Sequence, residues 1–119
     1  MDLFTGFQVE SRIASARARV LRAQDNRDVL VRNLEAEVHQ ALLAYVAALE
    51  KQAVANSAFE SALENLKLTQ QKYNVGSTTI LDLNTAQVNL TRASADRVTA
   101  LAAIRVAEAA LSRVRGRAE

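Results

Sequence analysis

The stretch Tyr73-Asn74-Val75-Gly76-Ser77-Thr78-Thr79-Ile80-Leu81-Asp82 decides the fold of this 119-residue chain, because it separates two long runs that contain no helix breaker. Glycine is common at the ends of helices, and the chain has only Gly6, Gly76 and Gly116, so we interpret all three as marking helix ends. Thr79 with Asp82 three residues later matches a capping box, which marks the beginning of a helix. We therefore predict one helix over about residues 8–72, a turn over about 73–78, and a second helix over about 79–115.

The composition favours helix throughout the chain. Alanine, the strongest helix former, supplies 23 of the 119 residues, and there is no proline. Cysteine is absent, which excludes a disulfide framework, a thiol nucleophile and a cysteine-ligated metal. The single histidine, His39, excludes a site built from several histidines of one chain. We expect no metal and no cofactor.

Apolar residues recur in alternating steps of three and four residues along both predicted helices, which is the pattern of a coiled-coil seam. On the first helix the seam positions are Val31, Leu34, Val38, Ala41, Tyr45, Ala48, Gln52, Ala55, Phe59, Ala62, Leu66, Thr69 and Tyr73. On the second helix they are Leu83, Ala86, Leu90, Ala93, Arg97, Ala100, Ile104, Ala107, Leu111 and Val114. The fold class that follows is all-α, a long antiparallel helical hairpin whose alanine-rich seam lets the helices approach closely.

A second apolar stripe accompanies each seam. It consists of Leu81, Val88, Ala95, Ala102 and Ala109 on the second helix, and of Leu42, Leu49 and Leu63 on the first. A two-helix hairpin needs only one stripe per helix, so two stripes indicate neighbours on two sides, as in a bundle or the wall of a helical barrel. We expect the isolated chain to associate with copies of itself, for example as an antiparallel dimer that forms a four-helix bundle.

The arginines lie towards the two ends of the chain. All twelve of them fall outside residues 33–91, a span with a net charge of −3. The arginines alternate with acids and have no aromatic stacking platform beside them, so solvated faces and ion pairs are favoured over nucleic-acid binding. Glu60 and Glu64 share one helix face, but no histidine or glycine-rich pocket accompanies them. We expect neither an enzyme nor a nucleic-acid-binding protein.

No membrane helix is expected. The longest apolar run is Ala41–Leu49, nine residues, which is about half of what a membrane helix needs. The start, Met1-Asp2-Leu3-Phe4-Thr5-Gly6, lacks the basic and apolar regions of a signal peptide. The expectation is a soluble chain without a signal peptide, excised or truncated from a longer protein.

The stretch from Tyr73 to Leu90 resembles the TolC-like outer-membrane efflux proteins. The matching features are Tyr73-x-x-Gly76, the triplet Leu81-Asp82-Leu83, then Ala86-Gln87 and Leu90. An alanine-rich helix follows and ends near Leu111 and Gly116. Leu3-Phe4-x-Gly6 before an arginine-rich helix resembles the exit from a membrane strand into the long periplasmic helix, which makes residues 1–7 the remnant of a strand-to-helix connection.

The resemblance implies a trimeric channel of an outer-membrane barrel and a periplasmic α-helical barrel, in a Gram-negative bacterium. Residues 1–119 would be a single hairpin of that helical barrel, and the start favours the second of its two repeats. The expected entrance residues at the tip are Thr78, Thr79, Asp82 and Thr85. The expected docking turn for a periplasmic adaptor (membrane fusion) protein is Tyr73, Val75, Gly76 and Ser77. The adaptor would connect the channel to an inner-membrane pump of the RND, ABC or MFS type.

A second interpretation follows from the coiled-coil pattern alone. The chain would then be a self-associating interaction module, or the hairpin of an adaptor protein, with no channel role. Adaptor hairpins sit within lipoyl and β-barrel modules, and this chain has neither.

Overall fold

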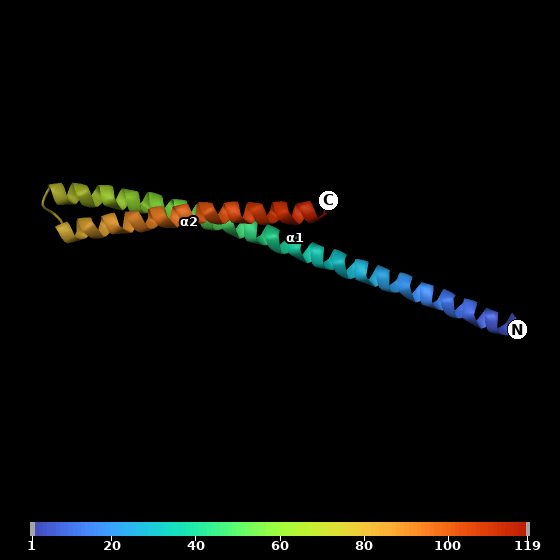
Figure 1. The fold of residues 1–119 in the computed structure, drawn as a ribbon. Coiled ribbons are helices and arrows are strands. Elements are labelled where there is room, and N and C mark those ends of the chain that lie inside the picture. Colours follow the sequence, from blue (N-terminus) through green and yellow to red (C-terminus); the bar gives the residue numbers. More distant parts are fainter. Residues whose placement is uncertain (1, 119) are drawn as a thin grey trace. The chain divides into compact units, whose positions relative to one another are not determined.

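The computed structural model describes residues 2–118 as two α-helices joined by a short turn (Figure 1). Helix α1 spans Asp2–Asn74 and helix α2 spans Ile80–Ala118, and no strand occurs in this part of the chain. The chain divides into two units, Met1–Glu37 and Val38–Glu119. In the second unit α2 lies antiparallel beside the later part of α1, so the predicted all-α helical hairpin is confirmed.

Both helices extend beyond their predicted outer ends. Helix α1 begins at Asp2 instead of near residue 8, and α2 ends at Ala118 instead of near residue 115. Gly6 and Gly116 therefore lie inside helices, and our interpretation of them as helix ends was wrong. A helical glycine costs only about 0.5–1 kcal/mol, which is too little to end a long helix by itself. Residues 2–7 are helical here, and their relation to a strand in a longer protein stays a prediction.

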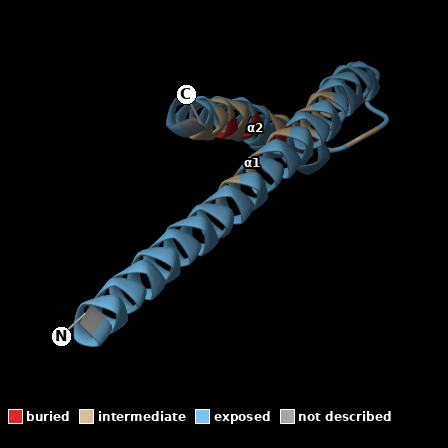
Figure 2. Cartoon of the chain, turned by 90° about the vertical axis from the view of Figure 1, so that its right-hand side faces the viewer, coloured by how far each residue is buried: buried red, intermediate tan, exposed pale blue. Residues whose placement is uncertain are grey.

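The core of the second unit follows the predicted seam (Figure 2). On α1, every predicted seam residue from Ala41 to Thr69 is buried or half-buried, whereas the predicted seam positions Val31, Val38 and Tyr73 are exposed. On α2, nine of the ten predicted positions are buried or half-buried, and Arg97 is the exception. The most buried residues are Ala48, Leu83, Ala86, Ala100 and Ala107. Four of these five are alanine, so small side chains occupy the most buried positions of the seam, while larger ones such as Phe59, Leu66 and Leu90 are half-buried.

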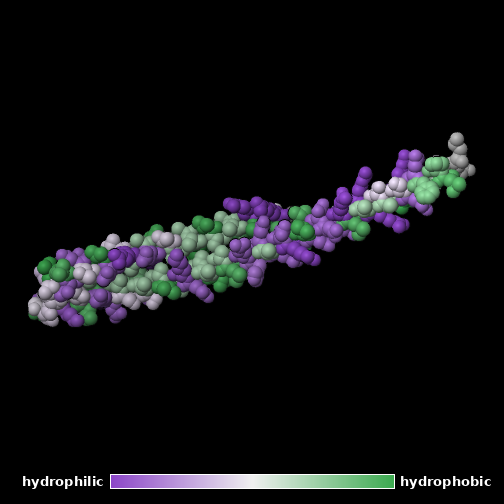
Figure 3. All heavy atoms as spheres, turned by 90° about the horizontal axis from the view of Figure 1, so that it is seen from below, coloured by the Kyte–Doolittle hydropathy of each residue, from purple (hydrophilic) through white to green (hydrophobic). Residues whose placement is uncertain are grey.

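The second apolar stripe lies largely in solvent in the described part of the second unit. Leu81 is 71% exposed and Val88 is 57% exposed on α2, and on α1 Leu63 is 49% exposed. Figure 3 shows hydrophobic residues on the outside of the paired helices, interspersed with hydrophilic ones. The hairpin thus buries one apolar stripe of each helix, and the second stripe of each helix stays exposed to solvent.

The first unit consists of a single helical segment. Every residue from Leu3 to Asn33 is exposed, including Ile13 and Val20, which are 48% and 57% exposed. Neither α1 nor α2, as far as the structure describes them, contains a stretch apolar enough and long enough to cross a membrane. A lone helical segment of this kind gains no stability from burial, so it depends on its helix propensity or on further partners.

Two polar residues stand out near the middle of the seam. The guanidinium carbon of Arg97 lies 5.0 Å from the centre of the Phe59 ring, which is a cation–π contact between α2 and α1. One turn earlier on α1, the side-chain oxygen Oδ1 of Asn56 is buried and has no hydrogen-bond partner among the described residues. A buried acceptor without a donor costs about 1–3 kcal/mol, so this level of the hairpin is the least satisfied part of its core.

Candidate functional site: the turn between the helices

The turn begins with a glycine-dependent helix end. Gly76 has a φ of 75°, and it is the only residue with positive φ that the structure describes. The Ser77 N–H donates to the Lys72 carbonyl at 2.8 Å, and the Gly76 N–H donates to the Tyr73 carbonyl at 3.0 Å. These two bonds form a Schellman motif, which satisfies carbonyls that the last turn of α1 would otherwise leave free.

The turn ends with a capping box at the start of α2. The Asp82 N–H donates to Thr79 Oγ1 at 3.3 Å, and the Thr79 N–H donates to Asp82 Oδ2 at 3.2 Å. This reciprocal pair is the arrangement that the spacing of Thr79 and Asp82 predicts, and the N-terminal end of α2 lies where the sequence indicates it. Helix α2 thereby gains partners for backbone donors that a helix start leaves unsatisfied.

Three hydrogen bonds converge on one oxygen of Asp82. Oδ2 accepts from the hydroxyls of Thr78 and Thr79, both at 2.7 Å, and from the Thr79 N–H. These donors, with the Thr78 hydroxyl first, lower the pKa of the Asp82 carboxyl below its ordinary value. The carboxylate is exposed and sits in the first turn of α2, where negative charge is also favoured by the helix dipole.

The remaining predicted site residues divide into two groups. Val75 is 78% exposed, Tyr73 is 39% exposed, and Ser77 is exposed, so the predicted docking turn presents side chains to solvent. The Thr85 hydroxyl instead donates to the Leu81 carbonyl at 2.8 Å within α2. The structure thus brings Thr78, Thr79 and Asp82 into one hydrogen-bonded cluster and leaves Thr85 outside it.

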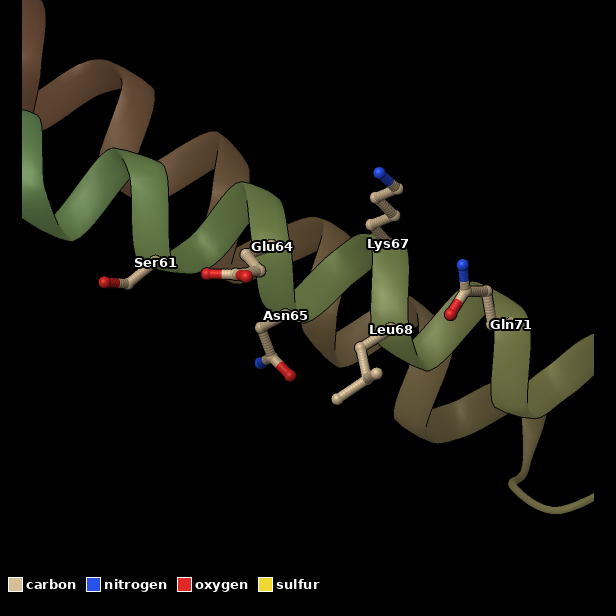
Figure 4. Close-up of a pocket in the computed structure, with 6 residues that line it drawn as sticks. All are labelled: Ser61, Glu64, Asn65, Lys67, Leu68 and Gln71. Carbon is tan, nitrogen blue, oxygen red and sulfur yellow. The ribbon is translucent and has the colours of Figure 1, made fainter.

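Grooves on the hairpin are shallow and open. One is lined by Ser61, Glu64, Asn65, Lys67, Leu68 and Gln71. Figure 4 shows these side chains along a single stretch of α1, with no second element that would close over them. Among the described residues no group of three or more histidine, aspartate or glutamate side chains is placed to hold a metal ion. The turn carries the hydrogen-bonded cluster of Thr78, Thr79 and Asp82, and this cluster lies on the surface and not in a pocket.

Sequence reasoning missed two features of this region. The first is the Thr78 hydroxyl as a donor to Asp82, since the capping box alone assigns that role to Thr79. The second is the completeness of the Schellman motif, which requires the carbonyls of Lys72 and Tyr73. The sequence Thr78-Thr79-x-x-Asp82 carried a signal for the first, because a second hydroxyl lies beside the helix cap.

A long antiparallel coiled-coil hairpin with a second, exposed apolar stripe and a capped acidic tip defines the class of protein as a helical assembly component. This chain belongs to the outer membrane efflux protein family, which it matches over residues 1–117. The resemblance seen between Tyr73 and Leu90 is thereby confirmed, and the chain is a component of an outer-membrane efflux channel, a transport protein. No curated protein and no solved structure matches the chain.

Substitution of glycine by alanine has opposite effects at the turn and in a helix. At Gly76 no atom lies within 4 Å of an added Cβ, so Gly76→Ala is destabilised by backbone strain alone, by about 1–2 kcal/mol. Gly116 has equal space but is helical, so Gly116→Ala raises stability by up to about 0.5–1 kcal/mol. Urea unfolding of both variants measures this difference. Equal effects of the two substitutions would contradict the positive φ at Gly76.

The lowered pKa of Asp82 predicts that the hairpin loses stability in acid. The pKa of Asp82 in the folded chain lies below its unfolded value of about 3.9. The carboxylate therefore contributes fully to the free energy of unfolding above the unfolded pKa, and this contribution is lost as the pH falls through the folded pKa. Titration of the Asp82 carboxyl by NMR measures the folded pKa directly. Thr78→Val removes the first donor and is expected to raise this pKa towards the ordinary value. A wild-type Asp82 that titrates at or above the unfolded pKa would contradict the hydrogen-bonded cluster.

Proposed function

We propose that this chain is a periplasmic hairpin in the α-helical tunnel of an outer-membrane efflux or export channel, and that its turn forms the channel entrance and the adaptor-docking region. The proposal gives the hairpin a place inside the family to which the chain belongs. The parent would be a homotrimer in the outer membrane and periplasm of a Gram-negative bacterium. Its partners would be a periplasmic adaptor protein and an inner-membrane pump of the RND, ABC or MFS type.

The exposed second stripe is the observation that carries the proposal. In a seven-residue repeat, the positions of Leu81 and Val88 lie nearly opposite the seam positions Leu83 and Ala86. A helix in the wall of a tube contacts neighbours on two nearly opposite sides, whereas a helix in a free hairpin contacts one. The side chains of Leu81 and Val88 are 71% and 57% exposed, and they supply the apolar surface that a second neighbour needs.

The charge of Asp82 supports the entrance role. The carboxylate is exposed at the end of the hairpin, and three hydrogen bonds to Oδ2 fix its position. A ring of such carboxylates, one or two from each protomer, would favour cations at the narrow end of the tunnel. Thr78 and Thr79 act in this proposal by holding Asp82, and Thr85 lies one turn further along α2 with its hydroxyl bonded to the backbone.

The backbone of the turn supports the docking role. Gly76 has no side chain, and nothing lies within 4 Å of the position that a Cβ would occupy. Beside it Val75 is 78% exposed and offers an apolar contact, while Ser77 and Tyr73 offer polar ones. A helical hairpin of an adaptor protein would thus approach the backbone closely at Gly76 and pack around it.

Adaptor binding tests the docking role. In the full-length channel that carries this hairpin, Gly76→Trp is expected to weaken binding of the cognate adaptor at least about tenfold, because loss of a close packed contact costs 1.4 kcal/mol or more. Gly76→Ala separates backbone strain from bulk, and Gly116→Trp places the same bulk in open space near the other end of α2. Wild-type affinity for Gly76→Trp, or equal weakening by Gly116→Trp, would contradict docking at the turn.

Ion selectivity tests the entrance role. Asp82→Asn keeps an acceptor for the threonine donors but removes the charge, so conductance of the full-length channel in planar bilayers is expected to lose much of its cation preference. Thr78→Val is the matched control, because it removes a donor to Asp82 and keeps the charge. If cation preference is unchanged in Asp82→Asn, the carboxylate does not line the entrance.

A further inference from the structure

The seam of the hairpin alternates large and small residues in a regular way. The small positions are Ala41, Ala48, Ala55, Ala62 and Thr69 on α1, and Ala86, Ala93, Ala100, Ala107 and Val114 on α2. The larger positions are Tyr45, Gln52, Phe59, Leu66 and Tyr73 on α1, and Leu83, Leu90, Arg97, Ile104 and Leu111 on α2. If α2 slides along α1 by seven residues, small residues again face small and large again face large. Seam packing therefore distinguishes poorly between registers that differ by one heptad.

Arg97 breaks this repeat. It is the only charged residue at a predicted seam position of the second unit, and its guanidinium lies 5.0 Å from the centre of the Phe59 ring. One heptad to either side of Phe59, the facing positions hold Gln52 and Leu66, which have no ring. A slip by one heptad in either direction thus removes the cation–π contact and leaves the arginine against an amide or an aliphatic side chain.

We propose that Arg97 is a positioning residue that sets the register of α2 on α1 by its contact with Phe59. The aromatic seam residues of α1 recur only every two heptads, at Tyr45, Phe59 and Tyr73, so the contact selects one register among the neighbouring ones. The caps at the turn hold the register at one end of the hairpin, and Arg97 holds it near the middle. This inference goes beyond the proposed function, because it concerns the hairpin with or without a channel around it.

The register determines which exposed residues lie level with each other. Leu81 and Val88 of α2, and Leu49 and Leu63 of α1, all face solvent in the hairpin. A slip of one heptad displaces the α2 pair along α1 by about 10 Å, given a rise of about 1.5 Å per residue. Any helix that packs against both members of the hairpin therefore requires the register that Arg97 selects.

Disulfide trapping in the full 119-residue chain tests the proposal, and the absence of native cysteine makes each introduced pair unambiguous. With Arg97 facing Phe59, Ala62 faces Ala93, so the pair Ala62→Cys with Ala93→Cys reports the native register. The pairs of Ala62→Cys with Ala86→Cys and of Ala62→Cys with Ala100→Cys report slips of one heptad in the two directions. The intramolecular disulfide of each pair is quantified at equilibrium in a glutathione buffer.

In the wild-type background we expect the native pair to oxidise and the slipped pairs to remain largely reduced. Arg97→Leu is expected to raise the ratio of slipped to native disulfide about three- to tenfold, which corresponds to a contact of about 1 kcal/mol. Phe59→Leu is expected to have the same effect, and the double variant no more than either single one, because both remove the same contact. Arg92→Leu, which changes an exposed arginine outside the seam, serves as the control and leaves the ratio unchanged.

The melting temperature separates register from stability. Arg97→Leu places an apolar side chain in an apolar seam, so a role in register alone predicts a looser register without a lower melting temperature. A lower melting temperature with an unchanged disulfide ratio would overturn the proposal, because Arg97 would then contribute only stability. If the ratio of slipped to native disulfide rises in Arg97→Leu but not in Phe59→Leu, the contact with the Phe59 ring does not set the register, and the proposal is overturned.

Discussion

The reversal of chain direction within residues 75–79 is the constraint on which the rest of the structure depends. A helix that ends and another that begins within five residues leave carbonyls and N–H groups that need partners. Gly76 with positive φ turns the chain so that the Gly76 and Ser77 N–H groups reach α1 carbonyls, and Thr79 with Asp82 serves the start of α2. Any other residue at position 76 would be strained in the left-handed conformation. The turn also places the start of α2 beside the end of α1, where the antiparallel seam begins.

Alanines occupy most of the buried positions where the two helices meet. Ala48, Ala86, Ala100 and Ala107 are among the most buried residues, and each buries little apolar area by itself. The most buried part of the interface therefore contributes little apolar area, and larger side chains such as Leu49 and Val88 remain exposed. A hairpin of this composition keeps its larger apolar side chains available for other helices. The leucines and valines that stay exposed outside the seam agree with membership of a family of assembled channels.

The sequence predicts most of this fold because local and periodic signals agree. The seam positions from Ala41 to Thr69 and the capping box at Thr79 and Asp82 are as predicted, since heptad spacing and capping chemistry depend only on nearby residues. The prediction fails at Gly6 and Gly116, where glycine was interpreted as a helix end. Glycine ends a helix when its N–H and that of the next residue find carbonyls to close the motif, and the residue type alone does not show this.

The candidate site is predicted in part for a similar reason. Spacing indicates the pair Thr79 and Asp82, but it does not show that the Thr78 hydroxyl turns towards the same oxygen. The contact of Arg97 with Phe59 depends on how α2 is aligned along α1, and so does the burial of Asn56 Oδ1, which has no hydrogen-bond partner in the described part of the chain. Such features need the facing helix, so they lie beyond what the pattern along one helix reports.

Asp82 joins two requirements that usually fall on different residues. As the last residue of a capping box it must accept hydrogen bonds, and Oδ2 receives all three that the structure shows for the carboxylate. As an exposed carboxylate with a lowered pKa it keeps its negative charge under mildly acidic conditions. The same bonds that complete the start of α2 therefore hold the charge in one place and keep it ionised. Loss of the charge and loss of the cap are separable only by paired variants, one that keeps the acceptor and one that keeps the carboxylate.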